Sequence, residues 1–227
     1  MKQILRRISD HIWIFPFDGP KDRPNLGYIK GSNFALAVDA GHSSSHVEDF
    51  YGQLEAADLP LPELTVLTHW HWDHTFGMHA VHGKTLACSK TNRKLRELRS
   101  EMDSDPLWGE RFLRSDPSIR REYAGGVPLV IVPADEEFSS DRIVDLGGLE
   151  VHIILAESPH TEDAVLVFVP EDRVLFIGDA QLGEFPSWKM DFGKLDRLAA
   201  QIERLEADLI VDGHWEVYRK QEFLMEL

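Results

Sequence analysis

The segment that most restricts how this chain can fold is HWHWDHTFGMHAVH, residues 69–82, which holds five histidines within fourteen positions. It directly follows LTVLT at 64–68, a short apolar run that is typical of a buried strand. In layered α/β folds, ligands gather at the loops that follow the carboxyl ends of strands. The position of the histidines therefore favours a functional site at one edge of a sheet.

Strand-like runs fill two stretches of the chain, and helix-like runs accompany each stretch. Before residue 60, the runs IWIFPF, LGYIK and NFALAVDAG end at Gly, Pro or Asp, and a serine cluster then begins a predicted helix that reaches about Ala57. From residue 129 onward, LVIV, RIVDL, LEVHII, AVLVFV and RVLFIG predict strands, followed by a helix over 193–206, the strand LIVD and a C-terminal helix. This pattern predicts an α/β fold, a four-layer αββα sandwich of two mixed β-sheets with outer helices.

The chain length suits a single domain. With 227 residues, no repeat and no linker, we expect one domain over residues 1–227. Residues 91–124 are predicted to be helical, with breaks, and Pro106 and Pro117 stand at expected helix starts. The part at 105–124 is either a lid over the site or a helical hairpin that covers the core, and the pattern leaves both interpretations open.

Charge and cysteine content restrict the partners and the compartment. A formal net charge of −15 disfavours nucleic acid and anionic membranes as partners, so we expect a small-molecule substrate. The single cysteine, Cys88, cannot form an intrachain disulfide and is expected to be a core residue. The N-terminal residues lack the pattern of a secretory signal, and no apolar run approaches the roughly 20 residues of a membrane span. These features predict a soluble, cytoplasmic protein.

Histidine and aspartate are natural ligands of zinc, so the spacing of these residues is informative. The pattern His-x-His-x-Asp-His at His69, His71, Asp73 and His74 would arise by chance in roughly 2 of 1,000 chains of this composition. It resembles the metal-binding signature of the metallo-β-lactamase superfamily. The later members of that family's ligand set are matched in order by His160 in SPHTEDA, Asp179 in LFIGDA and His214 in VDGHW.

The resemblance extends from about residue 34 to residue 214 and implies the same αββα sandwich. It implies a first metal ion held by His69, His71 and His160. It implies a second ion held by Asp73, His74 and His214, with Asp179 bridging the two. The ions are expected to be Zn²⁺, with Fe or Mn as alternatives, because imidazole and carboxylate suit all three metals.

The implied activity is hydrolysis by a metal-bridging hydroxide, with Asp73 as a catalytic residue that steers the hydroxide. We expect a small ester, thioester or lactone as the substrate. A phosphoester is an alternative, although no cluster of Lys and Arg is evident near the ligand loops. A further alternative is an iron-dependent oxidoreductase such as a persulfide dioxygenase, and a third is a metal-stabilised binding protein without turnover.

Several subfamilies resemble the chain less well. The true β-lactamases do not keep the bridging aspartate, which is present here as Asp179. Glyoxalase II has His-Thr-Pro-Gly where this chain has His160-Thr161-Glu162-Asp163. Acylhomoserine lactonases have a tyrosine soon after the bridging aspartate, where this chain has Gln181 and Leu182. The resemblance therefore identifies the superfamily and leaves the subfamily open.

The remaining candidates are residues around the ligand set. Asp39 is expected to support a metal-binding histidine, and the rings of Trp70 and Trp72 are expected to pack away from the ions. The histidines outside the signature are expected to be supporting or surface residues, namely His11, His42, His46, His79, His82 and His152. Candidate substrate contacts are Tyr28, Phe185, Trp188 and the 105–124 segment.

Overall fold

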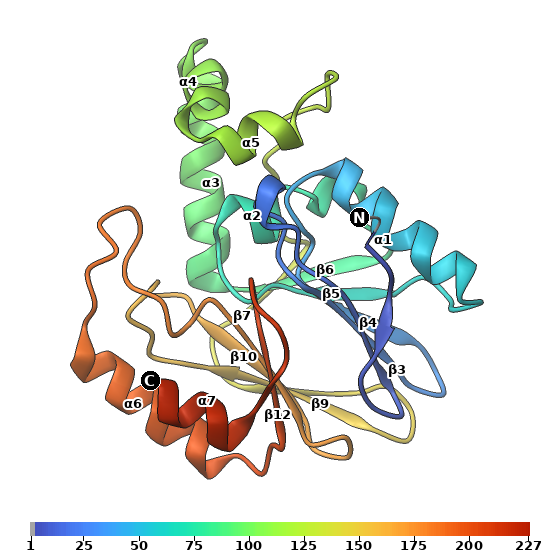
Figure 1. Ribbon diagram of the computed structural model, residues 1–227. Helices are drawn as coiled ribbons and strands as arrows, with labels where there is room; N and C mark the ends of the chain where they lie inside the picture. Colours follow the sequence, from blue (N-terminus) through green and yellow to red (C-terminus); the bar gives the residue numbers. More distant parts are fainter. Residues whose placement is uncertain (1–2) are drawn as a thin grey trace.

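The computed structural model describes residues 3–227, and it consists of two β-sheets packed face to face between outer helices (Figure 1). The first sheet has seven strands in sequence order: β1 (Arg6–Arg7), β2 (Ile12–Phe15), β3 (Leu26–Lys30), β4 (Ala35–Val38), β5 (Leu64–Val66), β6 (Lys84–Cys88) and β7 (Glu136–Phe138). Its first four strands form an antiparallel meander, whereas β4 to β7 pair in parallel. The sheet is therefore mixed, as expected.

The second sheet has six strands in the order β13-β12-β11-β10-β9-β8. The strands are β8 (Arg142–Asp145), β9 (Glu150–Leu155), β10 (Val165–Val169), β11 (Val174–Gly178), β12 (Leu209–Asp212) and β13 (Tyr218–Arg219). Only β11 and β12 pair in parallel. Because β10 is antiparallel to both β9 and β11, the strands β9, β11 and β12 point the same way, and their carboxyl ends meet at one edge.

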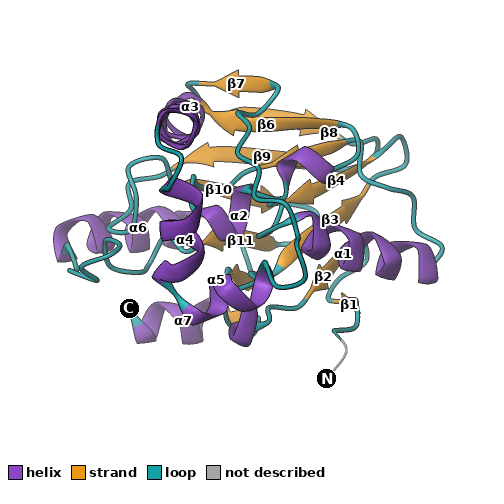
Figure 2. Ribbon diagram, turned by 90° about the horizontal axis from the view of Figure 1, so that it is seen from above, coloured by secondary structure: helices purple, strands orange, loops and turns teal. Residues whose placement is uncertain are grey.

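Helices cover both outer faces, which confirms the predicted four-layer αββα arrangement (Figures 1 and 2). The side of the first sheet carries α1 (Ser44–Ala56), α2 (Trp72–Thr75), η2 (Met78–Ala80), α3 (Ser89–Ser104), α4 (Trp108–Ser115) and α5 (Pro117–Glu122), with the short η1 (Gly19–Lys21) nearby. The second sheet is covered by α6 (Phe192–Arg204) and α7 (Lys220–Glu226). Within residues 3–227, no helix combines the length and apolar character that a bilayer crossing requires.

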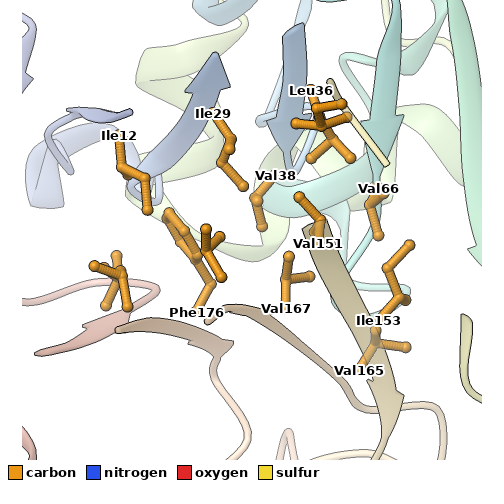
Figure 3. Close-up of a cluster of buried hydrophobic side chains, with 14 of the residues drawn as sticks. Ile12, Ile29, Leu36, Val38, Val66, Val151, Ile153, Val165, Val167 and Phe176 are labelled. Carbon is orange, nitrogen blue, oxygen red and sulfur yellow. The ribbon is translucent and has the colours of Figure 1, made fainter. Parts of the chain in front are cut away.

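The main hydrophobic core lies between the sheets (Figure 3). Aliphatic side chains from both inner faces meet there, among them Ile12, Ile29, Leu36, Val38 and Val66 from the first sheet and Val151, Ile153, Val165, Val167 and Phe176 from the second. Strand β10 is buried on both faces, because its alternate residues Leu166 and Phe168 pack outward against α6. This explains why the AVLVFV run reads as continuously apolar rather than alternating.

One predicted strand is absent. Residues 129–132, LVIV, form no strand, and the sheet resumes only at β7. Leu129, Ile131 and Val132 instead join a cluster with side chains of α3 and α4 on the outer side of the first sheet. Packing against helices removes these apolar side chains from water as well as a place in a sheet would. A short apolar run does not distinguish the two arrangements.

Candidate metal centre

Four loops at the shared edge of the two sheets carry the residues of the predicted ligand set. The segment with His69 follows β5, and the loop with His160 follows β9. Asp179 comes directly after β11, and His214 lies two residues after β12. Because β9, β11 and β12 end at one edge, residues that are far apart in the sequence lie close together. The pairing of the strands thus builds the site.

The seven side chains form two adjacent groups whose potential ligand atoms lie within 4.8 Å of one another in each group. The first group consists of His69, His71 and His160. The second group consists of Asp73, His74, Asp179 and His214. The grouping follows the sets that the resemblance implied, except that Asp179 falls in the second group. The side chains are almost fully buried except for that of His214, which is 15% exposed.

The carboxylate of Asp179 lies between the two groups. Its Oδ1 is 3.5 Å from His74 Nε2. Its Oδ2 is 3.7 Å from His160 Nε2 and 3.5 Å from His214 Nε2. One carboxylate therefore faces imidazoles of both groups, which is the arrangement needed to bridge two cations.

Asp39 orients one histidine in each group, as expected for a supporting acid. His74 Nδ1 donates a hydrogen bond of 2.7 Å to Asp39 Oδ2. The hydroxyl of Thr68 donates to the same carboxylate at 2.9 Å, and His69 Nδ1 lies 3.1 Å from that hydroxyl oxygen. Each of these rings is thus fixed through Nδ1, which turns Nε2 toward the centre. No sequence pattern singles out Thr68 for this role.

Three buried polar atoms that point into the centre have no hydrogen-bond partner within residues 3–227. They are His69 Nε2, His74 Nε2 and Asp179 Oδ1. An unpaired polar atom in the interior is costly, and its presence at a site commonly marks a missing ligand. His160 repeats the pattern, because its Nδ1 donates to Gly183 O at 2.8 Å and leaves Nε2 facing His71. The donor set fits divalent metal ions.

The electrostatics of the groups also suit cations. Burial, with the nearby imidazole of His160, lowers the pKa of His71 to about 3, so this ring is neutral and offers a lone pair. Burial opposes the charged form of Asp179, but the imidazoles of His214 and His74 outweigh it and hold the pKa of this carboxyl well below its usual range. Burial likewise opposes a charge on His74, yet the carboxylates of Asp73, Asp39 and Asp179 raise the pKa of His74 well above its usual value. A metal ion at this position would replace the proton.

Gly213 makes room for the bridging carboxylate. A Cβ atom at this position would lie 2.1 Å from Asp179 Oδ1 and 3.2 Å from His74 Cε1. Any larger residue would push Asp179 away from the groups or displace the loop that carries His214. The glycine of the VDGHW run is therefore required by close approach at the site.

Asn25 is a second residue that sequence reasoning missed. Its Nδ2 donates to Asp212 O and Trp215 O, both at 2.7 Å, and its backbone N–H donates to Gly213 O. Asn25, in the loop before β3, thus binds backbone oxygens on both sides of His214 and fixes the loop that carries it. The surrounding sequence, PNLG, resembles an ordinary turn and gives no signal for this role.

The other histidines lie outside both groups. The rings of His79 and His82 bond to backbone carbonyl oxygens, while His11 and His152 pair with acidic side chains. His42 and His46 are not surface residues, because both are fully buried. The ring of His42 lies edge-on to Tyr123, just after α5, which covers this loop.

The aromatic candidates divide between packing and exposure. Trp72 packs against Phe112 and Phe185, with ring centroids 6.0 and 5.0 Å apart, as expected for a packing residue. Tyr28 is fully buried and donates to Pro60 O at 2.8 Å, so its expected contact with substrate is wrong. Phe185 and Trp188 are 38% and 59% exposed beside the imidazoles of His71 and His160 and remain candidates for that contact.

A four-layer αββα sandwich with two adjacent His/Asp groups at one edge defines a class of metal-binding α/β proteins. The chain belongs to the metallo-β-lactamase superfamily, whose family model matches residues 20–216. This membership and the two groups together support a metal-dependent hydrolase.

Solved structures share the fold at low sequence identity. A metallo-β-lactamase from Pontibacter korlensis has a TM-score of 0.72 and 18% identity, covering 99% of this chain and 100% of that one. A metallo-β-lactamase from Hirschia baltica has a TM-score of 0.68 and 17% identity, covering 99% and 95%. FIM-1 from Pseudomonas aeruginosa in a mono-zinc form has a TM-score of 0.66 and 17% identity, covering 100% and 93%. At these identities the likeness establishes the fold alone.

Proposed function

We propose that the protein is a dinuclear metal-dependent hydrolase of a small ester, thioester or lactone. The observation that carries the proposal is the position of Asp179, whose carboxylate lies 3.5 Å from His74 Nε2 of the second group and 3.7 Å from His160 Nε2 of the first. A carboxylate in this position suits two neighbouring cations better than one. For this reason we favour a two-ion centre over the single iron of a persulfide dioxygenase.

In this proposal each group would hold one divalent ion, and Asp179 would be shared by both. His69, His71 and His160 would hold the first ion, and Asp73, His74 and His214 would hold the second. Zinc is our preferred metal, with iron or manganese as alternatives. When bound, such a pair supplies a hydroxide nucleophile at neutral pH and polarises the carbonyl oxygen of the substrate.

Asp73 is the side chain that we assign to steering the nucleophile. Burial disfavours its charged form, but the nearby imidazoles of His74 and His214 keep the pKa of Asp73 well below its usual range. Its Oδ2 lies 2.9 Å from His214 Nε2, on the side of the second group. An ionised carboxylate there accepts a hydrogen bond from the attacking water and orients its lone pair.

We further propose that α4 and α5 cover the centre and exclude water from it. The two helices lie beside α2 in the view from above (Figure 2). Phe112 of α4 contacts Trp72, which contacts Phe185 at the centre. The end of α5 is anchored by a buried ion pair, Arg23 Nε to Glu122 Oε2 at 2.7 Å, so any opening motion falls on α4. For residues 105–124 we therefore favour a lid over the site rather than a helical hairpin that only covers the core.

A β-lactam is not the substrate that we propose, because the true β-lactamases lack the bridging aspartate that this chain has as Asp179. A panel of chromogenic substrates tests the proposal, with one ester, one thioester, one lactone, one phosphodiester and one β-lactam assayed on zinc-loaded protein. Cleavage of an acyl substrate that Asp179→Ala abolishes is the expected result. Exclusive cleavage of the β-lactam or the phosphodiester would overturn the assignment.

A further inference from the structure

A cleft of about 460 Å³ opens beside the candidate metal centre, and His71 and His160 form part of its wall. The opposite wall comes from the first turns of α3, which lie next to the loop joining β11 to α6 (Figure 1). Because two ligand imidazoles line the cleft, a molecule bound there lies against the first metal position. The cleft is therefore a route by which part of a substrate reaches the centre.

Three cationic side chains of α3 line this cleft: Lys90, Arg93 and Lys94. Lys94 Nζ lies 5.3 Å from the ring centroid of Trp70, within the range of a cation–π interaction. The ring of Trp70 in turn packs at 4.4 Å against that of His71. Lys94 is thereby held close to the candidate metal centre while its side chain stays 39% exposed.

The cations of the cleft are only weakly paired with carboxylates. The carboxylate nearest to Lys94 is Glu97 Oε2, at 3.9 Å, which is a weak contact at a solvated surface. Lys90 Nζ donates to the backbone oxygen of Glu162 at 2.9 Å. Among residues 3–227, Arg93 forms no ion pair within 4.0 Å. Its guanidinium can accordingly offer two parallel N–H donors to a carboxylate.

Acidic side chains in the same cleft restrict which anion fits. Glu97, Glu162 and Glu184 are exposed members of its wall, and Asp163 is a buried one. They repel a dianion such as a phosphate monoester more strongly than a singly charged carboxylate. Because four acidic residues face three cations in this lining, the cleft disfavours a dianion, and a monoanionic group is held locally by the weakly paired Arg93 and Lys94.

The structure corrects the expectation that no Lys and Arg cluster lies near the ligand loops. The three cations belong to a stretch whose charges look like an ordinary solvated helix face in the sequence. They reach the site because β6 lies next to β5, so that α3 starts close to the loop that carries His71.

We propose that the first turns of α3 form a carboxylate-binding subsite, so that the substrate is an ester, thioester or lactone whose acyl part carries a carboxylate. This inference rests on the proposed hydrolase function. The acyl chain passes His71 and His160, with Phe185 as an apolar side wall, and its carboxylate binds Arg93 and Lys94. The subsite selects anionic substrates in spite of the net charge of −15 on the chain.

The test compares two esters of similar length on the zinc-loaded protein: para-nitrophenyl hydrogen glutarate, which carries a carboxylate, and para-nitrophenyl pentanoate, which does not. For Arg93→Gln and for Lys94→Gln we expect KM for the glutarate ester to rise about tenfold relative to KM for the pentanoate ester. Arg99→Gln is the matched control, because Arg99 is an exposed cation of α3 outside the cleft lining. It should leave both esters unaffected.

A binding measurement separates failure of the subsite from failure of the hydrolase. In calorimetric titration, glutaramate should bind to the zinc-loaded protein, and this binding should be lost in the double variant Arg93→Gln/Lys94→Gln. The uncharged glutaramide should not bind. If neither ester is cleaved but glutaramate binds in this way, the subsite stands and the hydrolase proposal fails. If both esters are cleaved with the same KM ratio in every variant, and glutaramate binding is unchanged, the subsite is refuted and the hydrolase stands.

Discussion

Substitution of Gly213 by alanine provides a direct test of how closely the bridging carboxylate is packed. The added Cβ would lie 2.1 Å from Asp179 Oδ1, whereas ordinary contacts begin at 3.4 Å, so the overlap is 3.4 − 2.1 = 1.3 Å. Metal coordination tolerates deviations of about 0.2 Å, far less than this displacement. We expect Gly213→Ala to lower metal affinity by about 10–100-fold and stability by about 1–3 kcal/mol.

The assay is titration of the purified variant with zinc in competition with a chromogenic chelator, together with thermal unfolding of the zinc-free form. Gly52→Ala is the control, because a Cβ at this exposed position of α1 meets nothing within 4 Å. Removing a glycine from a helix interior should stabilise the protein by about 0.5–1 kcal/mol and leave zinc binding unchanged. Wild-type zinc affinity and stoichiometry in Gly213→Ala would refute the assigned position of Asp179.

The residues around the two groups offer three more tests. Asp39→Asn removes the carboxylate that orients His74 and, through a hydroxyl, His69, so we expect zinc affinity to fall about 10–100-fold in chelator competition with an unchanged circular dichroism spectrum. Asn25→Ala removes two hydrogen bonds of 2.7 Å from the loop of His214 and should cost about 1–3 kcal/mol in urea unfolding. In the zinc-free protein the neighbouring carboxylates, opposed by burial, raise the pKa of His74 and His214 above 6.5. The stability that these rings contribute is therefore present below pH 6.5 and lost as the pH rises through the raised pKa, so the melting temperature of zinc-free protein should fall toward alkaline pH while that of zinc-loaded protein does not. A flat profile for both forms would contradict this assignment.

The sequence predicts the layers from local patterns, whereas the division of the ligand residues into two groups comes from the family resemblance. Runs of β-branched residues such as VLVFV specify a strand that is buried on both faces, and the ligand residues follow such runs directly. The positions of Asp179 and His214 after strands can therefore be recognised from the residue pattern alone. Asp179 and His214 come together because β11 and β12 run in the same direction. The expectation that they share one site came from the family resemblance.

The features that the sequence did not predict depend on contacts between distant segments. The burial of His42 depends on the end of α5 folding over its loop, and Asn25 acts only because the 212–215 loop lies across from it. The run LVIV at 129–132 is as apolar as a strand, and only the helices above it decide its conformation. No short-range pattern carries information of this kind.

A two-ion centre requires that seven side chains from both halves of the chain hold two neighbouring cations with Asp179 between them. Crystals grown with zinc and measured with X-rays at the zinc absorption edge test this arrangement most directly. We expect two anomalous peaks about 3.5–4 Å apart, one against each group, with the carboxylate of Asp179 in contact with both. A single peak, or two peaks with Asp179 turned away from either one, would contradict the two-ion centre.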